Sequence, residues 1–361
     1  MKNPGALMKS CKLLGIGFAI ALATSAAAAE PDATSVWSWF GDGLLRAEDV
    51  SGIPRADDAF HRAWARGRFG VQFDPSPEWR FAIASKASKA NNANDQDRRD
   101  NRNERSNAIG LDRLFVRWQA SESAALTLGK NELPLDLTPL IWDRDLRPAG
   151  LSADVSTSVG EFDRVAFVGG YFAGSHLYGD NSRIGALQAA YHWREGAPLS
   201  ASALVAYLDF SDLHQAALQG LTRTNRRSGA TLISDYRLVD VQLVGRARVH
   251  EWPLELRLDF VRNLGADDLR DGARASLVLG DMRQPRSWEF GFAVERIQRD
   301  AVMAAFNSDD WWFHSNMRGV MPWIGYGIDG TWSVRLAGFR ERRDDVRVHT
   351  RRVMLDLNAN F

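Results

Sequence analysis

Charged and apolar residues alternate along several stretches of this 361-residue chain, and the charged positions are its strongest candidates for a functional role. In the segment 62–73, "RAWARGRFGVQF", the arginines fall at even positions and most apolar residues at odd ones. Successive side chains of a strand point to opposite faces, so this pattern gives one face of guanidinium groups and one apolar face. Rows of fixed charge act on ions and polar solutes through their electric field. The residues predicted to share such polar, pore-lining faces are Arg62, Arg66, Arg68, Arg113, Arg117, Arg246, Arg248, Arg257, Glu255 and Asp259.

Signatures of covalent or metal chemistry are missing from the sequence. It contains no HExxH, GxSxG, P-loop or GxGxxG motif, and its seven histidines are scattered without the spacing of metal ligands. The neighbours Ser175-His176 and His314-Ser315 come nearest to a nucleophile beside a base. We therefore predict no catalytic residue, no metal site and no cofactor. The acid pairs predicted to be solvated in loops, or to hold Ca²⁺ or ions that bridge lipopolysaccharide, are Asp267-Asp268, Asp309-Asp310 and Asp344-Asp345.

The elements that position the charges are predicted to be antiparallel strands joined in hairpins. The clearest hairpin is "VDVQLVGRARVHEWPLELRLDF" at 239–260, in which the alternation continues on both sides of a turn. Short turns alternate with longer links, such as 91–107, 211–227 and 299–310. Aromatic residues near predicted strand ends would form two girdles at the borders of a membrane. They are Trp193, Trp252, Trp288, Trp311, Trp312, Trp323, Tyr326 and Trp332.

Counting back from the C-terminus gives about 16 strands. Fourteen or eighteen are also compatible with the sequence, because 37–48 and 150–159 are weakly patterned and 231–250 is overlong. The apolar faces could turn outward to lipid, as in a barrel, or inward to a core, as in a soluble sandwich. Charged faces on so many consecutive strands favour the barrel. We predict an all-β fold: a transmembrane, antiparallel, up-and-down β-barrel with an even strand number and both termini in the periplasm.

The segment 132–150, "ELPLDLTPLIWDRDLRPAG", differs from the other long links in its content of Leu, Pro and Trp. Apolar residues of this kind should not lie in solvent. We predict that the segment folds into the barrel and narrows the channel, with its charges facing the arginines of the wall. The alternative is a loop packed on the rim or at a subunit contact. The charged residues of this predicted constriction loop are Asp136, Asp143, Arg144, Asp145 and Arg147.

The two ends of the chain carry separate signals. Residues 1–29 contain lysines, then an apolar run from Leu13, then small residues, in the order typical of a secretory signal peptide. We predict Sec-type export, removal of this peptide, and one barrel domain over residues 30–361; the alternative is an N-terminal membrane anchor. Cys11 is the only cysteine and would leave with the signal. The formal net charge is +0, so no bulk field points to nucleic acid as a partner.

Several segments resemble the putative porins of Gram-negative bacteria. The most specific is "WDRDLRPAG" at 142–150, followed by Asn307-Ser308-Asp309. Phe361, at the end of an alternating strand, is similar to the signal that barrel-assembly machinery reads. The segments that carry the resemblance are 41–49, 59–73, 128–154, 252–272 and 305–339.

This resemblance implies a porin of the cell outer membrane that lets small hydrophilic solutes and ions diffuse passively. An excess of arginine on the predicted inward faces predicts a mild preference for anions. The expected partners are outer-membrane lipid and lipopolysaccharide, the barrel-assembly machinery, the solutes, and further copies of the chain in a homotrimer. The alternatives are a substrate-specific outer-membrane channel, a barrel enzyme and an exported soluble β-protein.

Overall fold

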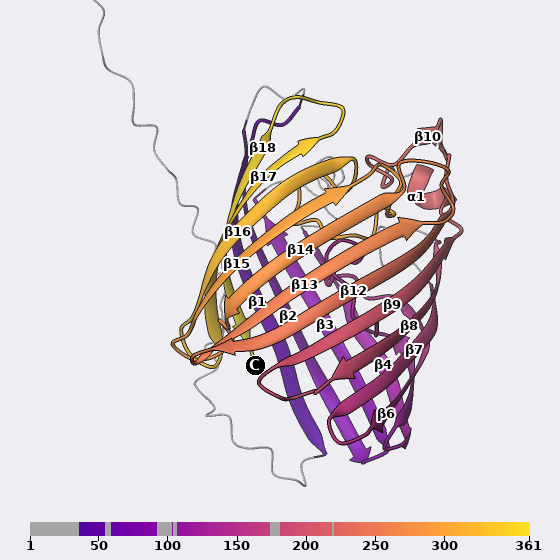
Figure 1. The fold of residues 1–361 in the computed structure, drawn as a ribbon, viewed down its shortest axis with the longest axis vertical. Helices are drawn as coiled ribbons and strands as arrows, with labels where there is room; N and C mark the ends of the chain where they lie inside the picture. Colours follow the sequence, from indigo (N-terminus) through magenta and orange to yellow (C-terminus); the bar gives the residue numbers. More distant parts are fainter. Residues whose placement is uncertain (1–35, 55–58, 92–102, 104–106, 174–180, 219) are drawn as a thin grey trace, which may run out of the picture. The chain divides into compact units, whose positions relative to one another are not determined.

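A computed structural model describes residues 36–54, 59–91, 103, 107–173, 181–218 and 220–361. The predicted signal peptide, 1–29, and Ser175-His176 lie outside the described residues. The compact unit Val36–Phe361 is a closed antiparallel barrel of sixteen strands, which confirms the predicted fold class (Figure 1). No helix in the described part of the chain is long and apolar enough to cross a membrane.

The barrel strands follow one another around the ring in chain order, and β18 closes the ring by pairing with β1. Between β9 and β12, a long connection holds the short helix α1 (His214–Leu218) and the small hairpin of β10 (Arg227–Ser228) and β11 (Thr231–Leu232). The sixteen barrel strands are β1 (Trp37–Ser51), β2 (Phe60–Ser76), β3 (Trp79–Ala90), β4 (Ala108–Ser121), β5 (Ala124–Lys130), β6 (Ala149–Val159), β7 (Asp163–Ala173), β8 (Arg183–Trp193), β9 (Ser200–Ser211), β12 (Tyr236–Val249), β13 (Trp252–Asn263), β14 (Asp271–Gly280), β15 (Trp288–Ile297), β16 (Met317–Gly327), β17 (Trp332–Arg343) and β18 (Thr350–Asn360).

Alternation along each strand separates the two faces of the wall. Large apolar side chains such as Leu45, Phe69 and Leu187 are exposed on the outside, while their charged or small neighbours point inward. An exposed apolar band of this kind on a closed barrel is typical of strands that cross a membrane. The connections are short at one end, here called the short-turn end, and longer at the other, here called the long-loop end.

Aromatic side chains gather at the short-turn end, as a girdle would. Trp37 packs on Phe73 with ring centroids 4.4 Å apart, and Trp288 on Tyr326 at 4.7 Å. The prediction was wrong for three other tryptophans: Trp311 and Trp312 are buried in a loop inside the barrel, and Trp323 points into the lumen. They lie near strand ends in the sequence, but packing inside the ring determines their place.

A large apolar cluster lies inside the barrel. Inward positions of β7, β8, β9 and β12 carry residues such as Phe172, Ile184, Leu208, Phe210 and Leu238, which are buried in one large cluster together with the loops inside the barrel. Buried charged residues also point inward, on β1, β2, β4, β12, β13, β14, β15, β17 and β18. The barrel therefore contains a hydrophobic core that fills part of its lumen.

The C-terminal residue takes part in closing the barrel. The N–H of Gly41 donates to the Phe361 carbonyl at 2.8 Å, and the Phe361 N–H donates to the Gly41 carbonyl at 3.1 Å.

Deleting Phe361 should lower the free energy of unfolding by about 2 kcal/mol, since each hydrogen bond contributes about 1 kcal/mol. Heat-modifiable migration on gels, after titration with urea, measures this loss. Phe361→Ala keeps both backbone bonds, so equal losses for the deletion and for this variant would contradict the closure argument.

Candidate functional site

The predicted constriction loop, 132–150, corresponds in the structure to the connection 131–148, which runs into the lumen and reaches strands far from its own. It leaves β5 and returns to β6, yet Asp136 contacts β8, β12 and β13. The backbone N–H of Asp136 donates to Gln188 at 2.9 Å, and its carbonyl accepts from Gln188 and Gln242, each at 2.9 Å. Its carboxylate forms an ion pair with Arg257 at 2.8 Å. The Thr138 hydroxyl donates to Asp259 on the same far strand, β13.

Apolar burial explains why this loop lies inside the barrel. Leu133, Leu135 and Leu137 are buried in the internal core, whereas Asp136 and Asp145 remain partly or fully exposed. Within the loop, the Asp143 carboxylate accepts the N–H of Asp145 at 2.9 Å, which fixes the turn. The buried apolar residues of the loop are Leu133, Leu135, Leu137, Leu140, Ile141, Trp142 and Leu146.

A second loop, 298–316, also folds inward. The sequence predicted a solvated outer loop here, and that prediction was wrong: residues 301–307 are all buried, and Asp309 is nearly so. The two inward loops also contact each other. The Asp143 N–H donates to the Phe306 carbonyl at 2.7 Å, and the Trp142 and Phe306 rings stack at 5.8 Å with an interplanar angle of 4°.

The wall also anchors this second loop. Glu341 of β17 accepts the backbone N–H groups of Trp312 and Phe313, each at 2.9 Å. Arg352 of β18 donates to the carbonyls of Asp309 at 2.8 Å and Asp310 at 2.6 Å. These bonds leave the Asp310 side chain as the part of this stretch that turns toward the open lumen.

Carboxylates from both loops meet arginines of β1 and β2. Asp145 pairs with Arg66 at 2.5 Å and with Arg68 at 2.9 Å, and Asp310 pairs with Arg46 at 2.9 Å. Both acidic side chains retain 32% of their accessible surface, whereas the three arginines retain 7–9%. These five residues, called the constriction below, place negative charge from the loops against positive charge from the wall. An ion that passes beside these ion pairs crosses their local field.

Neighbouring arginines keep the two loop acids ionised. Burial alone would raise the pKa of Asp145, but Arg66 and Arg68 outweigh burial and hold that pKa well below its usual range. The pKa of Asp310 is lowered in the same way, with Arg46 as the strongest of the arginines that oppose burial. Both carboxylates therefore stay charged at neutral and mildly acidic pH.

Ion selectivity should accordingly be constant from pH 8 to about 5 and shift toward anions only at a pH below the ordinary aspartate pKa of about 3.9, because the pKa values of both acids are lowered. The same linkage applies to stability. Because the folded-state pKa values of Asp145 and Asp310 are lowered, their ion pairs contribute fully to the free energy of unfolding above the unfolded-state pKa of about 3.9. This contribution is lost as the pH falls through the folded-state pKa values. Reversal potentials at pH 8, 5 and 3 measure the change. A shift between pH 8 and 5 would contradict this assignment.

The structure distributes the predicted pore-lining residues over two levels of the lumen. Arg62 is completely buried against Glu48, beside Arg352, and so holds the wall together. Arg66 and Arg68 reach the constriction. The other predicted pore-lining residues point inward at other places. Ion pairs join Arg113 to Glu132 at 2.5 Å, Arg117 to Asp154 at 2.8 Å, Arg246 to Glu255 at 2.9 Å, and Arg257 to Asp136. Asp259 accepts a hydrogen bond from the Thr138 hydroxyl, and Arg248 is exposed near the short-turn end.

The charged residues of the predicted constriction loop also differ in their surroundings. Asp136 and Asp145 face wall arginines, and Arg144 is exposed. Asp143 and Arg147 are buried, where Asp143 accepts from Asn103 at 2.8 Å and Arg147 donates to backbone carbonyls of the loop. Sequence reasoning missed Arg46 and the part played by Asp310. The apolar run "AVMAAF" at 301–306 was the available signal that this loop, too, would turn inward.

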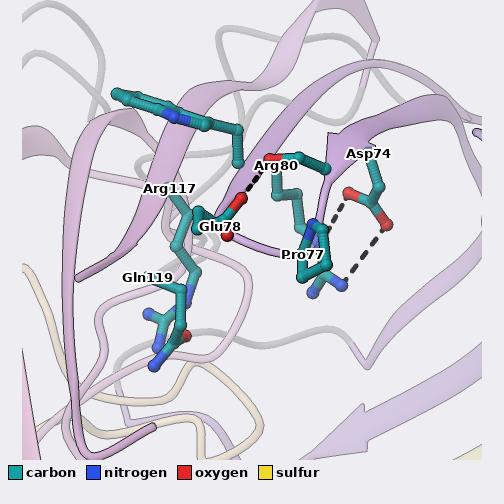
Figure 2. Close-up of a pocket in the computed structure, with 8 residues that line it drawn as sticks. Asp74, Pro77, Glu78, Arg80, Arg117 and Gln119 are labelled. Carbon is teal, nitrogen blue, oxygen red and sulfur yellow. Dashed lines mark hydrogen bonds and ion pairs between the residues drawn. The ribbon is translucent and has the colours of Figure 1, made fainter. Parts of the chain in front are cut away.

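The short-turn end of the lumen carries matched ion pairs. Figure 2 shows a small pocket there, lined by residues from the end of β2, β3 and β4, in which Arg80 pairs with Asp74 at 3.1 Å. Further around the ring, Arg117 pairs with Asp154 at 2.8 Å and Arg164 with Glu195 at 2.6 Å. Each of these three guanidinium groups is neutralised by a neighbouring carboxylate. Among the described residues, no group of three or more His, Cys, Asp or Glu could hold a metal ion.

Comparison with known proteins agrees with this architecture. Residues 44–186 match the model of a family described as "Putative porin". The resemblance drawn from the sequence is thus confirmed for this part of the chain, while the segments 252–272 and 305–339 lie beyond the match. No curated protein sequence matches the chain significantly.

Solved porin structures share the fold. The high-pH structure of Pseudomonas putida OprB has a TM-score of 0.60 at 15% identity, with 90% of this chain and 94% of that chain covered. Salmonella typhi OmpF in complex with daunomycin has a TM-score of 0.56 at 9% identity, covering 90% and 97%. A triple mutant of the Rhodopseudomonas blastica porin has a TM-score of 0.53 at 10% identity, covering 90% and 100%. The family match over residues 44–186 and the barrel shared with these structures agree with the resemblance to porins.

Proposed function

We propose that the protein is a water-filled channel for passive diffusion of small hydrophilic solutes and ions, with a mild preference for anions. One observation carries this proposal: Asp145 and Asp310, which belong to two inward loops, remain partly exposed inside the barrel and form ion pairs with Arg46, Arg66 and Arg68 of the wall. Facing rows of opposite charge orient water and favour small polar solutes over apolar ones. No covalent step is needed for this activity.

The anion preference rests on unequal pairing of charges near the constriction. Arg335 of β17 also points into the lumen and forms no ion pair with any described residue. Its charge acts on Asp310 through space and adds to the potential felt by an ion near the constriction, in the direction that attracts anions. The expected preference is mild, because most other arginines of the lumen form ion pairs with carboxylates.

We also propose how the chain is exported, inserted in the membrane and assembled. Residues 1–29 direct Sec-type export and are removed, and Phe361 presents the signal for the barrel-assembly machinery. The exposed apolar band then contacts outer-membrane lipid and lipopolysaccharide. Three copies of the chain form a homotrimer, a proposal that rests on analogy with barrels of this strand number.

Planar-bilayer recordings of the refolded chain, residues 30–361, test the channel directly. We expect discrete conductance steps, exclusion of polyethylene glycols above a limiting size, and a reversal potential in a KCl gradient that indicates modest chloride preference. Folded protein that inserts without conducting would overturn the channel proposal. A reversal potential of the opposite sign would overturn only the anion preference.

A further inference from the structure

One indole ring in the lumen is held flat against the wall. Trp323 of β16 lies opposite Gly291 of β15 in the antiparallel register. A Cβ at Gly291 would overlap the six-membered ring of this indole, so the absence of a side chain there is what lets the ring lie on the strand. On the next strand, Trp323 is paired with Ala337, which is also small.

Two polar side chains complete this part of the wall. The indole N–H of Trp323 donates to the Glu289 carboxylate at 2.8 Å, which fixes the ring orientation. The Arg335 guanidinium lies over the ring, with its central carbon 5.3 Å from the centroid. All three side chains are half-buried and thus still reach the lumen. A cation over an indole face is an attractive arrangement that holds the guanidinium in place.

Arg335 differs from other arginines of the short-turn half of the lumen. Arg80, Arg117, Arg164 and Arg246 each pair with a carboxylate at 2.6–3.1 Å. Arg335 donates only to the Met321 sulfur, at 3.9 Å, and has no ion pair with a described residue. Its neighbour across the β17–β18 pairing, Asp356, is already engaged by Arg46 through both carboxylate oxygens. The guanidinium therefore keeps N–H donors for a partner that comes from the lumen.

We propose that Trp323 and Arg335, with Glu289 positioning the indole, form a solute-binding subsite for small carboxylates that carry a flat apolar face. A guanidinium binds a carboxylate through two parallel N–H···O bonds, and an indole contributes flat apolar contact area beside it. This subsite deepens the proposed channel function and rests on it, because the solute must reach the lumen. Aromatic carboxylates and ring-shaped sugar acids share this chemistry.

Block of the KCl current tests the subsite on the refolded chain, residues 30–361, in a planar bilayer. Benzoate represents aromatic carboxylates, glucuronate represents sugar acids, and acetate has the carboxylate alone. We expect benzoate or glucuronate to block the current saturably, with half-block on the order of 1–10 mM. Acetate should be at least about tenfold weaker, and the order of benzoate and glucuronate distinguishes the two solute sources.

Arg335→Gln should weaken the block about tenfold or more, and Trp323→Leu should do so for benzoate and glucuronate alike. Arg248→Gln, which removes an inward arginine away from this subsite, is the matched control and should leave the block unchanged. Equal effects of acetate and benzoate on the wild type, or an unchanged block in Arg335→Gln, would overturn the subsite. Calorimetric titration of the folded protein in detergent with benzoate reports binding even if the barrel does not conduct, so failure of the channel and failure of the subsite give different results.

Discussion

Phe306→Ala should open the channel. The Phe306 ring is completely buried between Trp142, at 5.8 Å, and Phe210 of β9, at 5.2 Å, so it joins both inward loops to the apolar side of the wall. Removing a buried phenylalanine side chain costs about 3–5 kcal/mol, through lost contacts and the cavity that remains. Since the sixteen-stranded wall is held by its own hydrogen bonds, most of this loss should fall on the packing of the two loops.

The expected readout is a larger and noisier single-channel conductance, together with a higher size limit for polyethylene glycols. Phe292→Ala serves as the control, because Phe292 of β15 is exposed on the outer face and the same number of atoms is removed. Its conductance should equal that of the wild type. If Phe306→Ala conducts like the wild type while its barrel melts earlier, the loops do not determine the width of the passage.

Neutralising the loop acids should have the second large effect, on selectivity rather than width. Asp145→Asn removes the loop carboxylate from Arg66 and Arg68, which keep acidic partners on the wall, and Asp310→Asn removes the loop carboxylate from one donor group of Arg46. One unit charge acting on an ion about 5 Å away contributes about 1–3 kcal/mol, depending on how much water screens it. Each variant should therefore raise the ratio of anion to cation permeability several-fold, and the double variant more.

Reversal potentials in a KCl gradient measure this ratio. Asp329→Asn removes an equal charge from the exposed turn between β16 and β17, outside the constriction, and should change little. High salt should reduce the effect of both loop variants, since mobile ions screen exposed charges. Selectivity that responds to Asp145→Asn but not to Asp310→Asn would mean that the second loop does not border the ion path.

Much of the wall was predictable from alternation, because a period of two fixes which side chains share a face. The C-terminal strand shows this most clearly: Asp356 and Asn358 point inward, as the pattern of 353–361 requires, and Leu355 points outward. The overlong segment 231–250 resolves into the strand Tyr236–Val249, preceded by the small β10–β11 hairpin. Composition was also sufficient to suggest that 132–150 is not a solvated loop.

Alternation could not show what fills the interior. On β9, Leu204, Leu208 and Phe210 point inward while Val205 points outward, so both faces are apolar and the sequence does not distinguish core from lipid. The inward position of the second loop, 298–316, could not be predicted for another reason. Its acid pair is a common feature of exposed loops, and only contacts with β17 and β18, distant in sequence, place it in the lumen. Nor could the sequence show that Arg335 forms no ion pair with a described residue, because this depends on which side chains the neighbouring strands place beside it.

The packed interior has a geometric consequence. Because the apolar cluster and the two inward loops occupy part of the cross-section, the path left for water is narrower than the ring of strands and borders the loop acids that pair with arginines of β1 and β2. Barrel diameter normally grows with strand number and limits the bore. Here the thickness of the internal packing limits it instead, so two barrels of equal circumference could differ widely in what they let through.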